Sequence, residues 1–242
     1  MIAHDIESAL IGKADVSQAQ HLMRFFKTGP GEYGEGDRFL GIRVPVTRAV
    51  VKEYRDKIEL ADIDELLGSP WHEIRLCGFL LLIELYKKVS KLHDESAQRG
   101  LVQYYLSNLE RGNNWDLVDL VAPKILGDFL CSHPEQEDIL DKLANMDGHL
   151  WHQRVAIVAT LTLICAGSFD STLRISEKML NHKHDLIHKA TGWMLREMGK
   201  RGGMPLLVTF LDNHAHCMPR TMLRYAIEKL PLAQRHHYMQ RF

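Results

Sequence analysis

The chain contains 242 residues, of which 45% are hydrophobic and 25% are charged, and this ordinary composition excludes a disordered, fibrous or collagen-like chain. The longest apolar run covers residues 79–83, which is far too short to span a bilayer, so we expect no membrane partner. The net charge of −1 argues weakly against a nucleic-acid partner.

Helical periodicity runs through nearly the whole sequence, and no stretch shows the alternating pattern between hairpin turns that predicts a strand. Pro45 and Pro70 occupy positions typical of helix starts, and Gly167 and Gly202 mark breaks between periodic segments. The Gly-rich, acidic segment 29–37 is predicted to form a mobile loop. We expect helices at residues 2–13, 16–27, 45–57, 61–68, 70–89, 94–111, 114–132, 135–145, 150–166, 170–181, 185–200, 204–213, 218–229 and 231–240.

The expected helices form pairs with a repeating register. Trp71, Trp115 and Trp151 each open the first helix of a pair, and Ile187 takes the comparable place later, at spacings of 44, 36 and 36 residues. An irregular period near 40 favours HEAT-like repeats, whose neighbouring pairs bury their apolar faces jointly. The sequence therefore predicts an all-α, HEAT-like helical repeat solenoid in which residues 1–242 form a single domain and the first helices line one curved surface.

Positive charge is concentrated near the end of the chain. Residues 182–242 contain ten Lys and Arg and four Asp and Glu, a net +6, which leaves −7 in residues 1–181. A basic segment of this kind suits a polyanion, and an ordinary solvated helix face fits the same composition equally well. Four basic side chains fall in the early turns of first helices, namely Arg75, Arg154, Lys189 and Arg220.

The sequence offers little metal or cofactor chemistry. It contains no Walker loop, GxGxxG, GxSxG or HExxH motif, so we expect neither a metal nor a cofactor. The segments His182-Lys183-His184 and His236-His237 match no standard zinc spacing, which favours solvated or phosphate-facing histidines.

The cysteines and the first residues bear on location. The cysteines are widely spaced, form no CxxC pair and mostly lie in apolar helical patterns, so we expect buried, reduced thiols. Residues 1–12 lack a basic segment followed by an apolar run, the pattern of a signal peptide. Both observations favour a cytoplasmic protein.

The segment Asn113-Asn114-Trp115-Asp116-Leu117-Val118-Asp119 is the most unusual in the sequence. Trp115 and Asp119 are four residues apart and share one face of the expected helix. Asp116 stands in the first turn, where a carboxylate favours the helix dipole. Asp119 stands among apolar residues and needs a partner or a wet cavity, and Arg154 is a candidate buried partner.

A later segment combines a tryptophan with a glycine. Trp193 stands beside Gly192, which allows another backbone to approach closely. Taken singly, Trp193 fits core packing better than a site, and the same holds for Arg154.

Together these segments resemble the AlkD-type family of DNA glycosylases, over roughly residues 20–230. Four pieces in order carry the resemblance: Phe39-Leu40-Gly41-Ile42-Arg43-Val44-Pro45; Trp115-Asp116-Leu117-Val118-Asp119 with Pro123 and Leu126-Gly127-Asp128; Trp151-x-Gln153-Arg154; and Lys189-Ala190-x-Gly192-Trp193-x-Leu195-Arg196-Glu197.

The resemblance implies a role for each matching residue. Asp119 corresponds to the family's catalytic carboxylate, and Trp115 and Trp193 correspond to its cleft tryptophans. Arg154 corresponds to the cleft arginine, which suggests a phosphate clamp as an alternative to the buried partner. Where the family has a tyrosine on its N-terminal helix, this sequence has Phe25, with Leu22 as the other candidate, so the hydroxyl is lost.

The implied activity is that of a monofunctional DNA glycosylase. It would release cationic N3- or N7-alkylated purines from duplex DNA by hydrolysis, with the lesion held in the duplex and without a cofactor. A concave face of a monomer would bind the DNA, through residues that include Arg154, Phe25, Arg43, Lys189, Arg196 and Arg220. Two alternatives remain open: a non-catalytic protein that binds DNA structures, and a HEAT-like protein-interaction scaffold.

Overall fold

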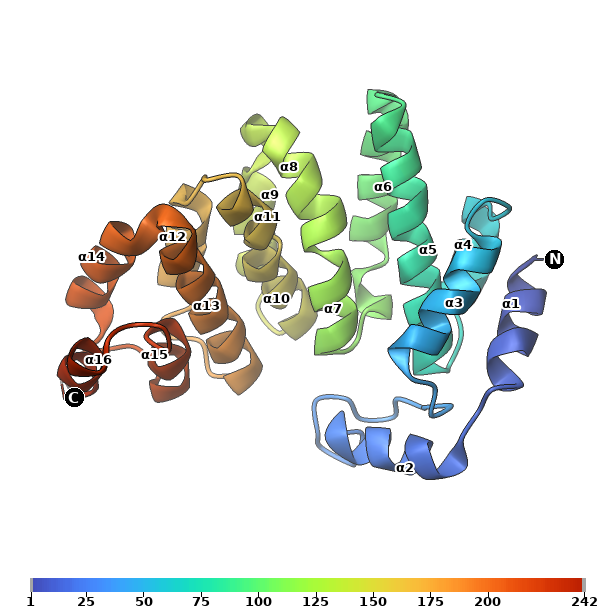
Figure 1. Ribbon diagram of the computed structural model, residues 1–242, viewed down its shortest axis with the longest axis horizontal. Coiled ribbons are helices and arrows are strands. Elements are labelled where there is room, and N and C mark those ends of the chain that lie inside the picture. The colour runs from blue at the N-terminus through green and yellow to red at the C-terminus, as the bar shows by residue number, and fades with distance from the viewer. Residues whose placement is uncertain (1, 241–242) are drawn as a thin grey trace. The chain divides into compact units, whose positions relative to one another are not determined.

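The computed structural model describes residues 2–240 and is all-α (Figure 1). Within those residues the one β-type pairing is an isolated bridge between Arg38 and Trp71. The expected all-helical fold is thus confirmed. Contacts divide the chain into two compact units, residues 1–117 and 118–242, so the single repeat domain stays a prediction. No helix of residues 2–240 has the length and apolar character needed to cross a membrane.

In the described part of the first unit, residues 2–117, six helices precede the boundary helix. They are α1 (Ile2–Ile11), α2 (Val16–Phe25), α3 (Val44–Tyr54), α4 (Leu60–Leu67), α5 (His72–Lys91) and α6 (Glu95–Ser107), followed by a 3-10 turn at Leu109–Arg111. Helix α7 (Trp115–Val121) contains the boundary between the units. Figure 1 shows α2 running crosswise to α3 and α5.

Helix α5 forms the centre of the first unit. It packs against α3, α4 and α6 and buries most of its length, including Phe79 and Tyr86. Gly78 permits the contact with α4, because a Cβ there would lie 3.0 Å from a side-chain carbon of Leu67. Burial of large apolar side chains supplies most of the stability of such a core.

The second unit continues with shorter helices. They are α8 (Asp128–Ser132), α9 (Asp138–Ala144), α10 (Leu150–Val158), α11 (Thr160–Cys165), α12 (Asp170–Lys178), α13 (Asp185–Met198), α14 (Met204–His214), α15 (Arg220–Ala226) and α16 (Leu232–Met239). A 3-10 turn (Pro134–Gln136) precedes α9, and π-helical turns occur at Pro123–Gly127 and Gly199–Gly203.

Consecutive first helices of the second unit stack on one another. Helix α10 packs on α9 and α13, and α13 packs in turn on α12 and α15. The contact of α13 with α15 requires Gly192, because a Cβ there would lie 2.4 Å from the carbonyl oxygen of Met222. The close backbone approach expected at Gly192 is confirmed. This neighbour-to-neighbour packing is typical of a repeat fold.

The helix expected at 114–132 is not regular. Pro123 has no N–H to donate to the carbonyl of Asp119, and Gly127 donates instead to the carbonyl of Ala122, 2.9 Å away across five residues. Gly127 also lies against the next helix, because a Cβ there would come within 2.3 Å of the carbonyl oxygen of Ala159. The α-helical hydrogen bonding is therefore replaced by a π turn at Pro123–Gly127.

The cysteine prediction was wrong in part. All four thiols are free, as expected, but only Cys77 is buried, and Cys131, Cys165 and Cys217 are exposed. Cys131 and Cys165 stand at the ends of α8 and α11, and Cys217 follows α14. An apolar neighbourhood in sequence did not bury them, because the chain turns towards solvent where a helix ends.

Candidate functional site

Arg154 binds Asp119 in the second unit through two parallel hydrogen bonds. Its Nε donates to Oδ1 over 2.9 Å and its Nη2 donates to Oδ2 over 2.8 Å. Nη1 donates to the carbonyl of Leu186, which ties the arginine to the start of α13. A charge-assisted, two-bonded pair of this kind is stronger than a neutral hydrogen bond. The structure thus forms the partner contact that the apolar setting of Asp119 required.

The two members of this pair differ in exposure. The side chain of Arg154 is 6% exposed and that of Asp119 is 18% exposed. The arginine is therefore a buried support, while the side chain of Asp119 remains partly exposed. A fixed, partly exposed carboxylate is suited to stabilising positive charge that develops beside it.

Trp193 lies half-buried on one stripe of α13. Lys189 and Arg196 share that stripe, because they are four residues before and three after it. Lys189 pairs with Asp185 over 2.7 Å, and Arg196 pairs with Glu228. The two cations are thus held by carboxylates of the chain itself.

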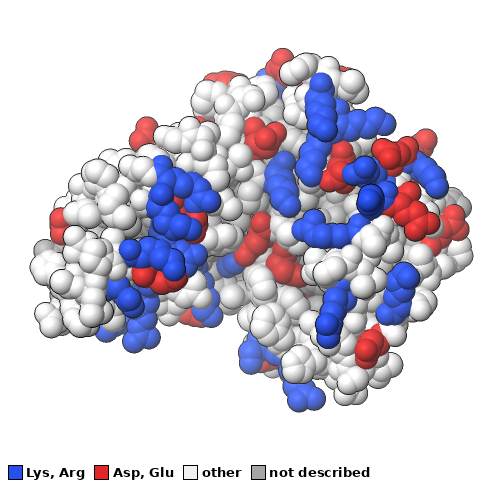
Figure 2. Space-filling model, in the orientation of Figure 1, with Lys and Arg blue, Asp and Glu red and all other residues white. Residues whose placement is uncertain are grey.

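The two remaining candidates for DNA contact, Arg43 and Arg220, are exposed. Arg43 precedes α3 in the first unit, and Arg220 opens α15 in the second. Nη1 of Arg220 donates to the carbonyl of Met239 over 3.0 Å. On the face shown in Figure 2, lysine and arginine side chains are intermixed with acidic ones and form no uninterrupted basic patch. Arg241, part of the basic count, lies outside the described residues.

Trp115 lies in an aromatic cluster of the first unit. Its ring stacks on Phe26 with centroids 5.3 Å apart, and Phe25 meets it edge-on at 6.0 Å. Leu22, the other candidate for the family tyrosine, packs partly buried against this cluster. Phe25 is 60% exposed. Of the two candidates, Phe25 is therefore the one that presents an accessible ring beside Trp115.

A buried ionic network that the sequence did not reveal lies next to this cluster. Nδ1 of His72 is 2.8 Å from Asp37, and Nε2 is 2.9 Å from Asp116. Arg75 donates to the other oxygen of Asp37 over 2.7 Å and to the side chain of Asn113 over 2.8 Å. His72 stands 35 and 44 residues from its two partners, so no local motif could have indicated the contacts.

The ionisation of this network follows from its contacts. Burial opposes the charged form of His72, but the charge of Asp116 and the hydrogen bonds to both carboxylates raise the pKa of His72 to about 9. Burial acts to raise the pKa of Asp37, yet His72 and Arg75 outweigh it and hold that pKa below its usual value. His72 is thus charged near neutral pH.

The segment Phe39–Pro45 has a structural function. The carboxylate of Glu73 accepts the backbone N–H groups of Leu40, Gly41 and Ile42 at 2.8, 2.8 and 3.0 Å. Gly41 has φ +85°, and a Cβ there would lie 2.0 Å from the carbonyl oxygen of Asp15. This part of the sequence resemblance therefore marks a buried loop that binds Glu73.

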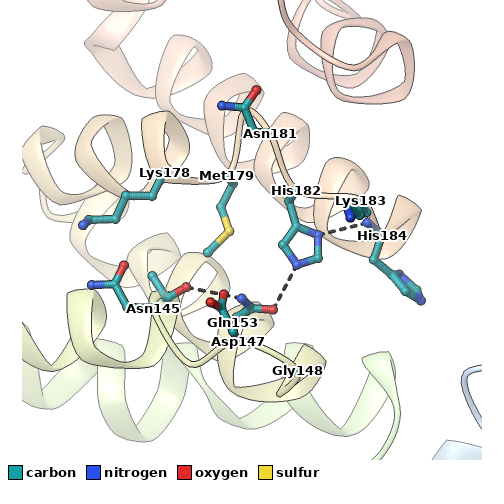
Figure 3. A pocket seen from close by; sticks show the side chains of 11 residues that line it. Asn145, Asp147, Gly148, Gln153, Lys178, Met179, Asn181, His182, Lys183 and His184 are labelled. Atoms are coloured by element: carbon teal, nitrogen blue, oxygen red, sulfur yellow. Dashed lines mark hydrogen bonds between the residues drawn. The ribbon is translucent and has the colours of Figure 1, made fainter.

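The second unit also contains a cavity of about 730 Å³ (Figure 3). His182 accepts the N–H of His184 at Nδ1 and contacts Gln153 through Nε2 over 2.9 Å. Burial and the neighbouring histidines lower the pKa of His182. Both ring nitrogens of His182 are hydrogen-bonded within the chain, so His182 has a structural role at this cavity. The cavity is lined by Ala144, Asn145, Asp147, Gly148, Gln153, Lys178, Met179, Asn181, His182, Lys183 and His184.

Comparisons with known proteins agree with the sequence resemblance. The sequence profile described as “DNA alkylation repair enzyme” matches residues 6–230. A solved structure described as “Predicted DNA alkylation repair enzyme from Enterococcus faecalis” has a TM-score of 0.70, and the match covers 90% of this chain and 97% of that one at 17% identity. At that identity the likeness shows the shared fold alone. No curated protein matches the chain.

The family profile covers nearly the whole sequence, including both units and every site residue named above. The expected membership is confirmed: the chain belongs to the DNA alkylation repair enzyme family.

Proposed function

We propose that the protein is a monofunctional DNA glycosylase that releases cationic N3- or N7-alkylated purines from duplex DNA. The observation that carries the proposal is the carboxylate of Asp119, which Arg154 holds on both oxygens while 18% of its side chain stays exposed. In a chain of the DNA alkylation repair family, such a carboxylate is suited to hydrolysis of a glycosidic bond.

Hydrolysis of this glycosidic bond requires a fixed negative charge and does not require an acid that protonates the base. A purine alkylated at N3 or N7 is already cationic, so its bond to the sugar breaks without protonation of the base. Positive charge then develops on the deoxyribose, and Asp119 stabilises it and orients the attacking water. Each tenfold gain in rate requires about 1.4 kcal/mol of stabilisation in the transition state. Arg154 assists by keeping the carboxylate ionised and fixed in orientation.

Aromatic rings supply the contacts to the lesion. Trp115 and Phe25 form an edge-on pair in the first unit, and Trp193 lies half-buried on α13 in the second. The face of an aromatic ring attracts a cation by roughly 0.5–2 kcal/mol. We assign these rings to contacts with the deoxyribose and the cationic base.

Basic residues are assigned to the DNA backbone. Arg43 and Arg220 are exposed, whereas Lys189 and Arg196 are paired with acids of the chain. A phosphate must therefore replace Asp185 beside Lys189 and Glu228 beside Arg196. The HEAT-like concave face and capture of the lesion without base flipping remain parts of the proposal. A phosphate clamp is the alternative role for Arg154, and it would require Arg154 to give up its pair with Asp119.

The test is incubation of the purified protein with methylated duplex DNA. A monofunctional glycosylase releases the methylated purine and leaves an abasic site, and the strand breaks only after later treatment with alkali. Chromatography of the released bases measures the first product, and gel analysis with and without alkali measures the second. Absence of base release under single-turnover conditions would reject the proposal.

Two observations favour a second candidate, a DNA-binding protein without catalysis. Both oxygens of Asp119 are engaged by Arg154, as in a purely structural ion pair, and Phe25 lacks the hydroxyl that the family resemblance leads us to expect. That candidate predicts tight binding to branched or distorted duplexes without base release. A third, a protein scaffold, predicts no DNA affinity even at low salt, whereas phosphate contacts make affinity fall steeply as salt rises.

A further inference from the structure

His72 lies buried between two carboxylates, and their chemistry fixes its charge. Its side chain is 2% exposed, and its two ring nitrogens contact Asp37 and Asp116 at 2.8 and 2.9 Å. An ionised carboxylate can only accept a hydrogen bond. Both ring nitrogens must therefore donate, which means that the ring is an imidazolium.

The same ring begins a continuous aromatic stack that ends at Trp115. Phe39 stacks on His72 with centroids 4.3 Å apart, Phe26 stacks on Phe39 at 5.0 Å, and Trp115 stacks on Phe26 at 5.3 Å. A second connection passes along the chain, because Asp116 directly follows Trp115 in the first turn of α7. His72 thus contacts both the stack beneath the tryptophan and the helix turn that carries it.

No other cation substitutes for His72 at Asp116. Among the described residues, Oδ1 of Asp116 is buried and has no hydrogen-bond partner, so its known contact is the one from Oδ2 to His72. Asp37 differs, because it also receives Arg75. The carboxylate of Glu73, next to His72 in the sequence, already accepts hydrogen bonds from three backbone N–H groups. Loss of the His72 proton would therefore leave Asp116, whose side chain is 14% exposed, as an uncompensated and largely buried charge.

We propose that His72 is a positioning residue that sets the orientation of Trp115 for contact with the lesion, acting through the aromatic stack and through Asp116. The inference rests on the proposed function of Trp115. His72 would thus act on alignment of the lesion. Alignment affects the rate strongly, because a shift of reacting groups by about 1 Å can lower a rate by about 100-fold.

Substitutions separate the two hydrogen bonds of His72. His72→Gln places an amide nitrogen near the position of Nε2 and retains a bond to Asp116, whereas His72→Asn retains one to Asp37. Neither variant keeps the charge. If Asp116 transmits the effect, His72→Gln should retain more activity than His72→Asn. A matched control is His133→Gln in the second unit, because His133 is also buried, stacks on Phe129 and donates to the backbone.

The experiment uses full-length protein labelled with 5-fluorotryptophan. The ¹⁹F resonance of Trp115 is assigned from Trp115→Phe and followed between pH 6 and pH 10. We expect it to shift with a midpoint near the His72 pKa of about 9 in the wild type, and to be flat in both His72 variants. The rate of single-turnover base release should fall about 10- to 100-fold in the variants. DNA affinity should change less than about threefold, because misalignment of Trp115 affects the reaction step more than binding.

Each outcome decides one of the two claims. If His72→Gln and His72→Asn lower only thermal stability, and change neither the Trp115 resonance nor the rate of base release from bound DNA, the positioning role is wrong. If the variants fail to fold, the pH titration of the wild-type resonance decides, and a flat titration rejects the role. If wild-type protein releases no base, the proposed function fails, while the fluorine titration still tests the coupling of His72 to Trp115.

Discussion

Arg154 makes two hydrogen bonds to the carboxylate of Asp119, and the arginine is the more deeply buried partner, at 6% against 18% exposure. This asymmetry supports the proposal that Arg154 is the support and that Asp119 is the group that meets a ligand. The same geometry makes the pair important for stability, so its catalytic and structural contributions have to be measured separately.

A double-mutant cycle measures the structural contribution. Arg154→Ala leaves Asp119 and the carbonyl of Leu186 without the guanidinium, and we expect a loss of about 3 kcal/mol in the free energy of unfolding. Adding Asp119→Asn should recover part of that loss, because it removes the negative charge that Arg154 faces in the wild type. Urea denaturation measures both. The exposed pair of Arg99 with Glu95 is the control, and Arg99→Ala should cost under about 1 kcal/mol. Equal losses at Arg154 and Arg99 would contradict this description of the pair.

The pKa of His72 predicts a pH dependence of stability. Folding raises this pKa from 6.5 to about 9, so the folded state holds a proton that the unfolded state releases. The stabilisation, about 3 kcal/mol, is fully present below pH 6.5, declines as pH rises and is lost above pH 9. The difference in unfolding free energy between wild type and His72→Gln should shrink accordingly. A difference that stays constant from pH 6 to pH 10 would show that His72 is not charged.

Gly192→Ala tests the packing of the second unit, and Gly100→Ala in the first unit is its control with an expected effect of opposite sign. Gly192→Ala puts a methyl group 2.4 Å from the carbonyl oxygen of Met222, and we expect a loss of about 1–3 kcal/mol. Gly100→Ala, in the exposed part of α6, meets no atom within 4 Å and should gain about 0.5–1 kcal/mol from helix propensity. Thermal unfolding compares the two, and a Gly192→Ala variant as stable as the wild type would argue against the α13–α15 contact.

Phe25 tests the aromatic contacts to DNA. Because its ring is 60% exposed, Phe25→Ala should change stability little, while loss of a ring contact of roughly 0.5–2 kcal/mol should lower base release about 2- to 30-fold. Leu92→Ala, also in the first unit and 70% exposed, is the control. Base release by Phe25→Ala equal to that by Leu92→Ala would remove Phe25 from the DNA-binding surface.

The helices were predictable because their apolar period and end signals are local. Pro45, Gly167 and Gly202 lie at element ends or breaks as expected. The π turn at Pro123 was not predicted, because it depends on a contact with a neighbouring helix that the local sequence does not show. Thr162 provides that contact by donating to the carbonyl of Pro123.

The candidate site was predictable where a charged residue stands among apolar neighbours in the sequence. Asp119 among apolar neighbours required a partner, and Arg154 was a candidate from its place at the head of a buried helix. His72 gave no such signal, because a histidine followed by a glutamate at a helix start is ordinary. Its proposed positioning role depends on Asp37 and Asp116, which folding alone brings to it.

The most direct test of the glycosylase proposal is single-turnover release of methylated purine by wild type and by Asp119→Asn at matched DNA occupancy. The substitution keeps the size of the side chain and a hydrogen-bond acceptor but removes the negative charge. We predict at least about a 100-fold loss of rate, equivalent to about 3 kcal/mol of transition-state stabilisation, with duplex affinity retained. Release by Asp119→Asn at the wild-type rate would contradict the assignment of Asp119 as the catalytic carboxylate.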